Sequence, residues 1–177
     1  MELNIFTKLE MNKDAKERIA RKAAGLVEDG DTIFLDPSST TYLMIPFLAG
    51  KDITVLTNGI SHINQLVALD IPCIMVGGSI KKTTNSCIGP ITETTLRTLY
   101  FSKCFLGANG FSITSGITNH DINERVIKLL ALNNSCQPYF LIDHTKYGIV
   151  TMVQIANLDQ YPILTVSYTH LRAHETR

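Results

Sequence analysis

Short apolar runs alternate along the chain with segments whose apolar residues recur every three or four positions. Each apolar run is bounded by turn residues and predicts a strand. The predicted strands cover residues 32–36, 53–58, 73–78, 103–110 and 138–143, with two short closing strands at 153–158 and 163–166. The recurring segments predict helices over residues 12–27, 40–49, 61–69, 91–100 and 121–133. Continuously apolar strands that alternate with helices predict an α/β fold: a mostly parallel open sheet with helices on both faces.

Within the helices, the spacing of the apolar residues predicts which side chains face the core. Asn12 is expected to be the N-cap of the first helix, because its side-chain oxygen can accept a backbone N–H there. The helix over residues 61–69 is expected to point Ile63, Leu66 and Val67 inward.

The composition fits one domain and argues against two kinds of partner. The chain has 177 residues, 45% of them hydrophobic and 18% charged, with a formal net charge of zero. No apolar run approaches the ~20 residues of a membrane span, and no signal-peptide pattern opens the sequence, so we expect a cytoplasmic protein. Zero net charge argues against nucleic-acid binding by this chain alone.

The cysteines predict reduced thiols rather than a metal site. Cys73, Cys87, Cys104 and Cys136 show no Cys-x-x-Cys pairing and no nearby histidine at zinc spacing. We therefore expect neither a metal ion nor another cofactor.

Small or polar residues end five of the predicted strands, whereas the strand interiors are apolar. These strand-end segments are residues 36–41, 57–58, 77–78, 107–110 and 143–146. Open α/β sheets bind ligands beyond the carboxyl ends of their strands. Because the five segments converge on one edge of the sheet, they predict a polar site for a small, hydrogen-bonding ligand.

The segment after the first strand carries four consecutive hydroxyls, from Ser38, Ser39, Thr40 and Thr41. It precedes a predicted helix, where unpaired backbone N–H groups and partial positive charge suit a phosphate. A second interpretation stays open, in which the segment only caps the helix and stabilises it by ~1 kcal/mol. The glycine pattern and the lysine of a Walker loop or a dinucleotide fingerprint are absent.

Four ionisable residues are further candidates for the site: Asp36, Glu124, Asp143 and Lys146. A carboxylate beside a phosphate would repel it, so Asp36 is expected to face sugar hydroxyls further along the ligand. Lys146 either offsets the charge of a phosphate or carboxylate or is an ordinary surface lysine. His144 is expected to be a polar turn residue rather than a catalytic one.

Short motifs follow one another in a fixed order along nearly the whole chain, from about residue 6 to residue 165. They include GDTIFLD at 30–36, TVLTN at 54–58, GANG at 107–110 and DHTKYG at 143–148. This ordered set resembles the C-terminal sensor domain of DeoR-type bacterial repressors of sugar metabolism. The resemblance implies a fold like that of ribose-5-phosphate isomerase, and it favours a homo-oligomer. It also implies a phosphorylated sugar or similar metabolite as ligand, which modulates DNA binding by a separate N-terminal helix-turn-helix domain.

Carried over residue by residue, the resemblance implies a ligand site in three parts. The phosphate loop is formed by Ser38, Ser39, Thr40 and Thr41. The sugar pocket is lined by Asp36, Thr57, Asn58, Gly77, Gly78, Asn109, Gly110 and Lys146. A helix contributes Glu124 and Lys128. Ser38 stands where many relatives have glycine, and Pro37 stiffens the same loop, so the chain departs from the family's pattern there.

The resemblance also divides the chain. Residues 1–166 are predicted to form the phosphosugar-sensing domain. The family's helix-turn-helix is absent before Asn12, so DNA is expected as a partner only through that missing domain. Residues 167–177 (SYTHLRAHETR) lack apolar periodicity and are predicted to be a non-native, poorly ordered tail.

Three functions are compatible with these features. The leading hypothesis is a ligand-sensing module, not an enzyme, in which a phosphosugar shifts the domain or its oligomer between two arrangements. The alternative is a sugar-phosphate isomerase of the same architecture, in which Asp36, Glu124 and Lys146 could supply the general base and the enediolate-stabilising group. A third possibility is a degenerate protein left by truncation, with neither role.

Overall fold

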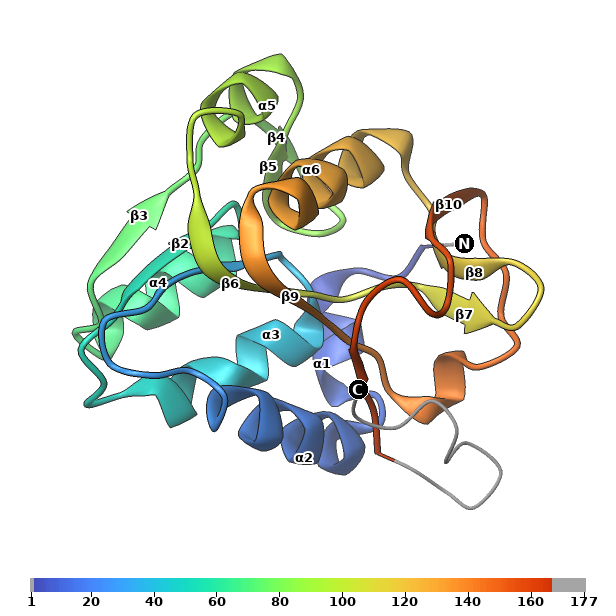
Figure 1. Cartoon of the computed structure of the whole chain (residues 1–177), viewed down its shortest axis with the longest axis horizontal. Helices are drawn as coiled ribbons and strands as arrows, with labels where there is room; N and C mark the ends of the chain where they lie inside the picture. The colour runs from blue at the N-terminus through green and yellow to red at the C-terminus, as the bar shows by residue number, and fades with distance from the viewer. Residues whose placement is uncertain (1, 167–177) are drawn as a thin grey trace.

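The computed structural model describes residues 2–166, and its main element is a six-stranded parallel sheet (Figure 1). The strand order is β11-β9-β6-β1-β2-β3. These strands are β1 Thr32–Leu35, β2 Thr54–Thr57, β3 Cys73–Met75, β6 Phe101–Leu106, β9 Ser135–Leu141 and β11 Ile163–Leu164. Every neighbouring pair runs parallel, which confirms the predicted sheet. The predicted non-native tail, residues 167–177, lies outside the described residues.

Helices cover both faces of this sheet, which confirms the α/β class (Figure 1). One face is covered by α2 Lys13–Ala24, α3 Ser39–Met44, the 3₁₀ helix η1 Ile45–Leu48 and α4 Ile60–Ala68. The other face is covered by α5 Pro90–Leu96 and α6 Ile122–Asn133.

Successive residues of each strand pack against opposite helical layers, because strand side chains point alternately to the two faces of a sheet. In β1, Ile33 and Leu35 join the apolar cluster under α2 and α3, whereas Phe34 joins the cluster under α5 and α6. All three side chains are fully buried. Burial on both faces explains why the strands are continuously apolar in the sequence.

Two small antiparallel sheets extend this framework, and the apolar pattern predicted neither. β4 Ser79–Lys81 and β5 Ser86–Ile88 pair within residues 79–90, for which neither a strand nor a helix was predicted. β7 Gly110–Ser112, β8 Gly116–Asn119 and β10 Val153–Ala156 form a three-stranded sheet. The prediction that residues 153–158 close the main sheet is therefore wrong, because this segment pairs with β8 instead.

The predicted first helix is shorter in the structure, and another helix precedes it. α1 Ile5–Glu10 was not predicted, and α2 begins only after Asn12, which adopts a left-handed φ of 53°. Asn12 occupies the N-cap position but forms no side-chain cap hydrogen bond. The predicted helix over residues 40–49 changes to 3₁₀ geometry at Ile45. The next residue, Pro46, has no N–H to continue α-helical bonding.

One residue predicted to face the core lies on the surface. Val67 on α4 is 66% exposed, and the buried face of that helix carries His62 and Leu66 instead. The His62 Nε2 atom lies 3.0 Å from both the Thr41 Oγ1 and the Ser38 carbonyl oxygen, behind the segment that follows β1. Burial lowers the pKa of His62 to about 4, so the ring is neutral at pH 7.

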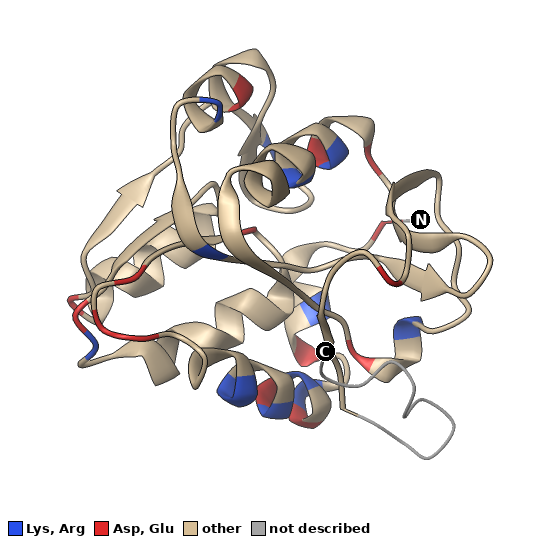
Figure 2. Cartoon of the chain, in the orientation of Figure 1, with Lys and Arg blue, Asp and Glu red and all other residues tan. Residues whose placement is uncertain are grey.

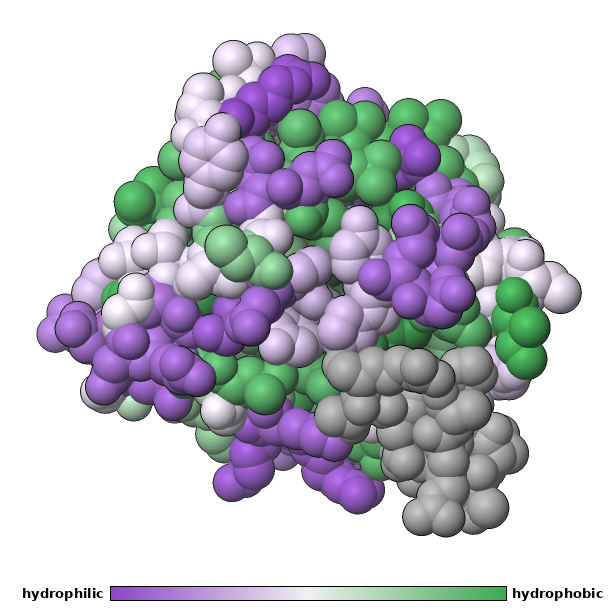
Figure 3. Space-filling model, in the orientation of Figure 1, coloured by the Kyte–Doolittle hydropathy of each residue, from purple (hydrophilic) through white to green (hydrophobic). Residues whose placement is uncertain are grey.

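The surface carries both signs of charge, mixed with apolar areas. Figure 2 shows lysine, arginine, aspartate and glutamate together on the outer side of α2. Figure 3 shows an apolar area over α6, where Ile122 is 58% exposed. None of the helices in residues 2–166 has the length and apolar character that a membrane span requires.

Candidate functional site

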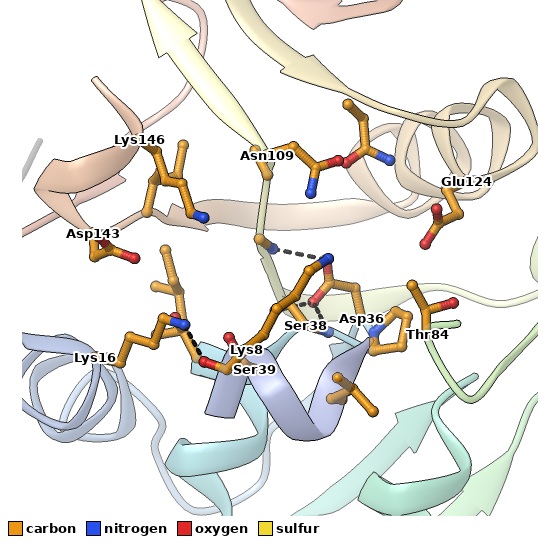
Figure 4. A pocket seen from close by; sticks show the side chains of 18 of the residues that line it. Lys8, Lys16, Asp36, Ser38, Ser39, Thr84, Asn109, Glu124, Asp143 and Lys146 are labelled. Carbon is orange, nitrogen blue, oxygen red and sulfur yellow. Dashed lines mark hydrogen bonds between the residues drawn. The ribbon is translucent and has the colours of Figure 1, made fainter. Parts of the chain in front are cut away.

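A cavity opens at the carboxyl edge of the sheet, where the strand order reverses between β1 and β6. β2 and β3 extend the sheet beyond β1, whereas β9 and β11 extend it beyond β6. A reversal of this kind is where open α/β sheets bind their ligands. The open space at this position, its mouth and solvent included, is about 650 Å³. Figure 4 shows the side chains that surround it.

Asp36 joins two walls of this cavity. The side chain is fully buried at the end of β1. Its Oδ1 accepts from the Ser38 backbone N–H at 3.1 Å and from the Ser38 hydroxyl at 2.6 Å. Its Oδ2 accepts from the Gly107 N–H at 2.7 Å and from the Lys128 ammonium at 2.5 Å. These four internal bonds use both carboxylate oxygens, so Asp36 holds two walls of the site together. Contact of Asp36 with sugar hydroxyls stays a prediction.

The charge of Asp36 is retained because Lys128 compensates it. Burial by itself would raise the pKa of the Asp36 carboxyl, but the Lys128 ammonium and the hydrogen bonds from Ser38 and Gly107 outweigh it and lower the pKa. The pair is therefore an ion pair at pH 7, and Asp36 adds no net negative charge to the cavity.

A glycine is required where the two walls touch. A Cβ atom at Gly107 would lie 2.5 Å from the Ser38 Cβ and 2.7 Å from its hydroxyl oxygen. Only glycine permits so close an approach without a shift of the chain. Any larger side chain at position 107 would push residues 38–41, the hydroxyl-rich segment, away from residues 107–109, which connect β6 to β7.

The hydroxyl-rich segment presents unused donors to the cavity. Ser38, Ser39 and Thr40 line it at the start of α3. Ser38 makes no side-chain cap hydrogen bond to the helix, because its hydroxyl bonds to Asp36 instead. The first N–H groups of the helix are therefore open to a ligand, and this argues against the interpretation that the hydroxyls only cap the helix.

The cavity brings four lysines and four carboxylates together, and three of the lysines lack an ion-pair partner in residues 2–166. Its charged lining residues are Lys8, Lys16, Lys128, Lys146, Glu2, Asp36, Glu124 and Asp143. Lys128 pairs with Asp36, and Lys81, which lies outside the lining, pairs with Glu2 at 2.7 Å and with Glu124 at 2.8 Å. Within residues 2–166 this leaves three lysines and one carboxylate without an ion-pair partner. Lys81 also pairs with Asp121 at 3.0 Å, so the lining together with these two residues holds five lysines and five carboxylates, and its formal net charge is zero. Lys8, Lys16 and Lys146 nevertheless have no carboxylate within ion-pair distance in residues 2–166.

Two of these unpaired lysines are poorly solvated. Lys16 is 3% exposed, and its ammonium donates to the Lys8 carbonyl oxygen at 2.5 Å. Burial lowers the pKa of Lys8, and it lowers that of Lys16 to about 8. Burial likewise raises the pKa of the Glu124 carboxyl. Buried cations that lack a counter-ion are stabilised by an anionic ligand.

Two asparagine amides complete the lining, on the β6–β7 segment and at the end of β8. The Asn109 Oδ1 accepts from the His120 N–H at 2.9 Å, and Figure 4 shows the Asn109 side chain at the cavity. Asn119 is 3% exposed, and its Nδ2 has no hydrogen-bond partner in residues 2–166.

The structure brings eight of the fourteen predicted site residues to this cavity. These eight are Asp36, Ser38, Ser39, Thr40, Asn109, Glu124, Lys128 and Lys146. The six that do not line the cavity are Thr41, Thr57, Asn58, Gly77, Gly78 and Gly110. Ligand binding by any of the fourteen stays a prediction.

Several residues outside the cavity have internal partners. Thr57 accepts a backbone N–H at 3.1 Å, and the Asn58 amide donates to the Cys87 carbonyl oxygen at 2.9 Å. The Gly77 carbonyl accepts from the Thr92 hydroxyl at 2.7 Å. These residues stabilise the neighbouring strands and loops, and we leave them out of the proposed site.

Sequence reasoning missed five polar lining residues: Glu2, Lys8, Lys16, Thr84 and Asn119. One of them carries a signal that could have found it. Lys16 interrupts the buried stripe of α2, which also contains Ile19 and Ala20, and a charged residue is seldom buried without a purpose. The others come from segments whose approach to the sheet depends on long-range folding.

Metal-ligand groups and disulfides are absent from the residues that the structure describes. No group of three histidine, cysteine, aspartate or glutamate side chains within residues 2–166 is placed to hold a metal ion. The four cysteines form no disulfide among themselves. Burial raises the pKa of the Cys104 thiol to about 12, so this thiol is not a nucleophile at pH 7.

The fold and the site define a class of protein: an α/β domain with a polar, lysine-containing cavity at the switch point of a parallel sheet, suited to a small ligand. Comparison with known families is more specific. Residues 11–167 match the family model described as "DeoR C terminal sensor domain", so the chain belongs to this family. The resemblance drawn from the motifs is thereby confirmed.

The similar curated proteins are named as transcription regulators. The chain is 35% identical over 172 residues to the "Uncharacterized HTH-type transcriptional regulator FruR" of Bacillus subtilis, covering 97% of this chain and 68% of that protein. It is 31% identical over 164 residues to the "Lactose phosphotransferase system repressor" of Staphylococcus aureus, covering 91% and 65%. The chain thus spans about two thirds of the length of these relatives.

Solved structures share the fold at low sequence identity. A ribose 5-phosphate isomerase A from Methanocaldococcus jannaschii aligns with a TM-score of 0.56 and 18% identity, covering 85% of this chain and 59% of that one. A translation initiation factor eIF-2B from Pyrococcus horikoshii aligns with a TM-score of 0.60 and 17% identity, covering 81% and 51%. These likenesses confirm the isomerase-like fold and say nothing about activity.

Proposed function

We propose that this domain is the effector-binding part of a DeoR-type regulator of sugar metabolism and that its cavity binds a phosphorylated sugar. The observation that carries the proposal is that three cavity lysines, Lys8, Lys16 and Lys146, have no ion-pair partner in residues 2–166. A phosphate monoester carries about −1.5 to −2 charges at pH 7, so it would supply these lysines with a counter-ion.

The phosphate would lie over the start of α3. Ser39 and Thr40 offer backbone N–H groups and hydroxyls there, and Lys8, Lys16 and Lys146 supply the charge. Charge-assisted hydrogen bonds contribute ~1.5–3 kcal/mol each, so three or four of them suffice for micromolar affinity.

The effect on DNA would require parts of the protein beyond this domain. Two relatives from Bacillus subtilis are named HTH-type transcriptional regulators, and their chains are longer than this one. We propose that DNA is bound by a separate N-terminal domain, and that the sensor domain acts as a homo-oligomer. Glu2, Ile5 and Lys8 line the cavity, so an effector would contact the segment through which such a domain connects.

A thermal-shift panel tests the ligand. Ribose 5-phosphate, fructose 6-phosphate and glucose 6-phosphate are compared with the three dephosphorylated sugars. A ligand at 100 times its Kd adds ~2.7 kcal/mol of stability, which raises the Tm of a domain of this size by about 5 to 10 °C. A shift with at least one phosphosugar and none with its parent sugar is expected. A shift only with the parent sugars would refute the phosphate assignment.

A charge-reversal variant tests the location. Thr40→Asp places a carboxylate at the start of α3 and should abolish phosphosugar binding by repulsion. Thr95→Asp on the exposed side of α5 is the matched control and should bind normally. Equal affinity in both variants would show that the phosphate lies elsewhere.

The isomerase alternative has one observation in its favour. Burial raises the pKa of the cavity carboxyl of Glu124, as suits a group that transfers protons. Incubation with ribose 5-phosphate, followed by NMR for the ketose product, tests this activity. Turnover that is lost in the Glu124→Gln variant would make the domain an enzyme. We expect no turnover, because internal donors already bond both oxygens of the Asp36 carboxylate.

A further inference from the structure

We propose that Asn119, together with Asn109, binds a hydroxyl or carbonyl oxygen on the carbon chain of the effector. The inference rests on the proposed function, because it assigns the part of the same cavity that distinguishes one phosphosugar from another. Neither the ordered motifs nor the resemblance pointed to Asn119.

The Asn119 amide is buried without a partner. The residue is 3% exposed, and its Nδ2 makes no hydrogen bond within residues 2–166. Within residues 2–166, other buried side-chain atoms without a hydrogen-bond partner belong to Asn58, His62, Gln65 and Thr165. None of these lines the cavity, whereas Asn119 does. A buried amide without a partner destabilises the free protein, so its position against an open cavity indicates that a ligand completes the bonding.

Asn109 fixes the position of Asn119 by bonding the residues that precede and follow it. The Asn109 backbone N–H donates to the Thr118 carbonyl oxygen at 3.1 Å, and the Asn109 Oδ1 accepts from the His120 N–H at 2.9 Å. These two bonds hold the residues on either side of Asn119. Because the oxygen of the Asn109 amide is used, its NH₂ group remains for the cavity, and a rigid pair of amides results.

The Asn109 amide lies across the cavity from the proposed phosphate site. Figure 4 shows Asn109 on the wall opposite Ser39, with Glu124 on the side wall. A phosphate over the start of α3 would therefore direct its carbon chain toward the amides. A hydroxyl there can accept from an amide N–H and donate to the Glu124 carboxylate, and this combination recognises a sugar hydroxyl.

The first experiment needs no ligand. In the full chain, Asn119→Leu replaces the unpartnered amide with an apolar group of similar size and should raise the Tm by about 2 to 4 °C. Asn58→Leu is the matched control and should lower the Tm, because the Asn58 amide donates to the Cys87 carbonyl oxygen at 2.9 Å. A Tm that falls in both variants would overturn the proposal, since Asn119 would then be a structural amide.

The second experiment measures affinity by calorimetry for two probes. Asn119→Leu should weaken binding of the tightest phosphosugar in the panel about tenfold or more. It should leave binding of inorganic phosphate within about twofold, because the phosphate contacts are unchanged. Phosphosugar affinity that falls less than threefold, or inorganic phosphate affinity that falls equally, overturns the proposal.

The two proposals can fail separately. If only dephosphorylated sugars bind the wild-type chain and Asn119→Leu weakens them, the phosphate assignment fails and the role of Asn119 is supported. If no sugar and no phosphosugar binds the wild-type chain, both proposals are overturned.

Discussion

Binding of a phosphosugar should weaken as the pH rises from 8 to 10, because the cavity holds part of its positive charge on an easily deprotonated lysine. Burial lowers the pKa of Lys16 from the ordinary 10.5 to about 8, and the attraction of Asp143 offsets this only in part. A bound dianion stabilises the ammonium form and moves the pKa of Lys16 back toward 10.5.

The magnitude follows from linkage between proton and ligand binding. Above pH 8 the free protein must take up a proton to bind, so affinity falls up to about tenfold for each step of one in pH. If ligand binding restores the pKa of Lys16 fully to 10.5, the affinity falls by at most about 300-fold between pH 7 and 11. Folding stability of the ligand-free chain changes in the opposite direction: between pH 8 and 10.5 the unfolded chain holds more protons at Lys16, so this residue makes stability rise with pH.

Calorimetric titration of fructose 6-phosphate at pH 7.5 to 10, in buffers of different ionisation enthalpy, measures both affinity and proton uptake. Lys16→Met should bind weakly at pH 7.5, with little further loss at higher pH. Lys13→Met removes an exposed lysine from the same helix and should titrate like the wild type. Constant affinity of the wild type over this range, or an equal decline in Lys16→Met, would refute the assignment of Lys16.

Three further predictions concern stability. Lys128→Met leaves Asp36 charged and unpaired in the interior and should cost about 3 to 5 kcal/mol in urea unfolding, more than half of which the double variant with Asp36→Asn should restore. His62 should make stability fall by about 3 kcal/mol between pH 6.5 and 4, because the unfolded chain takes up a proton that the buried ring does not. His62→Gln should flatten that part of the pH profile of urea midpoints. Lys81→Met should speed amide hydrogen exchange in α1 about fivefold, since Lys81 bonds a carboxylate of the N-terminal segment. Arg97→Met, which removes an exposed ion pair of 4.0 Å, should leave that exchange rate unchanged.

The parallel sheet was predictable because its central strands are largely buried on both faces. Such strands are mostly apolar, and this pattern survives in segments as short as β1 Thr32–Leu35, where the last three residues are fully buried. The pairing of β4 Ser79–Lys81 with β5 Ser86–Ile88 was not predictable in this way. Ser79 and Ile80 are exposed, and polar residues intervene, so no apolar run marks the hairpin.

Eight of the fourteen predicted site residues line the cavity. Which strand ends meet there depended on the strand order, which the sequence does not show. Thr57 and Gly77 follow the apolar runs of β2 and β3 much as Asp36 follows that of β1, so sequence gave no basis for preferring one. Only the order β9-β6-β1-β2-β3 shows that the crevice lies between β1 and β6. That order is a long-range property of the chain. Asn119 was unpredictable for the same reason, because it depends on the pairing of β8 with β7 and β10.

The position of Asp36 answers an objection to an anion site at this edge of the sheet. A free carboxylate at the end of β1 would repel a phosphate, and for this reason the sequence suggested that Asp36 faces the sugar. In the structure Lys128 neutralises it, and its oxygens are directed toward Ser38 and Gly107. The Asp36 carboxylate therefore positions the Ser38 segment without adding net negative charge to the cavity. Charge recognition is left to Lys16 and the other unpaired lysines, so Asp36 variants should lose stability first, whereas Lys16 variants should lose affinity first.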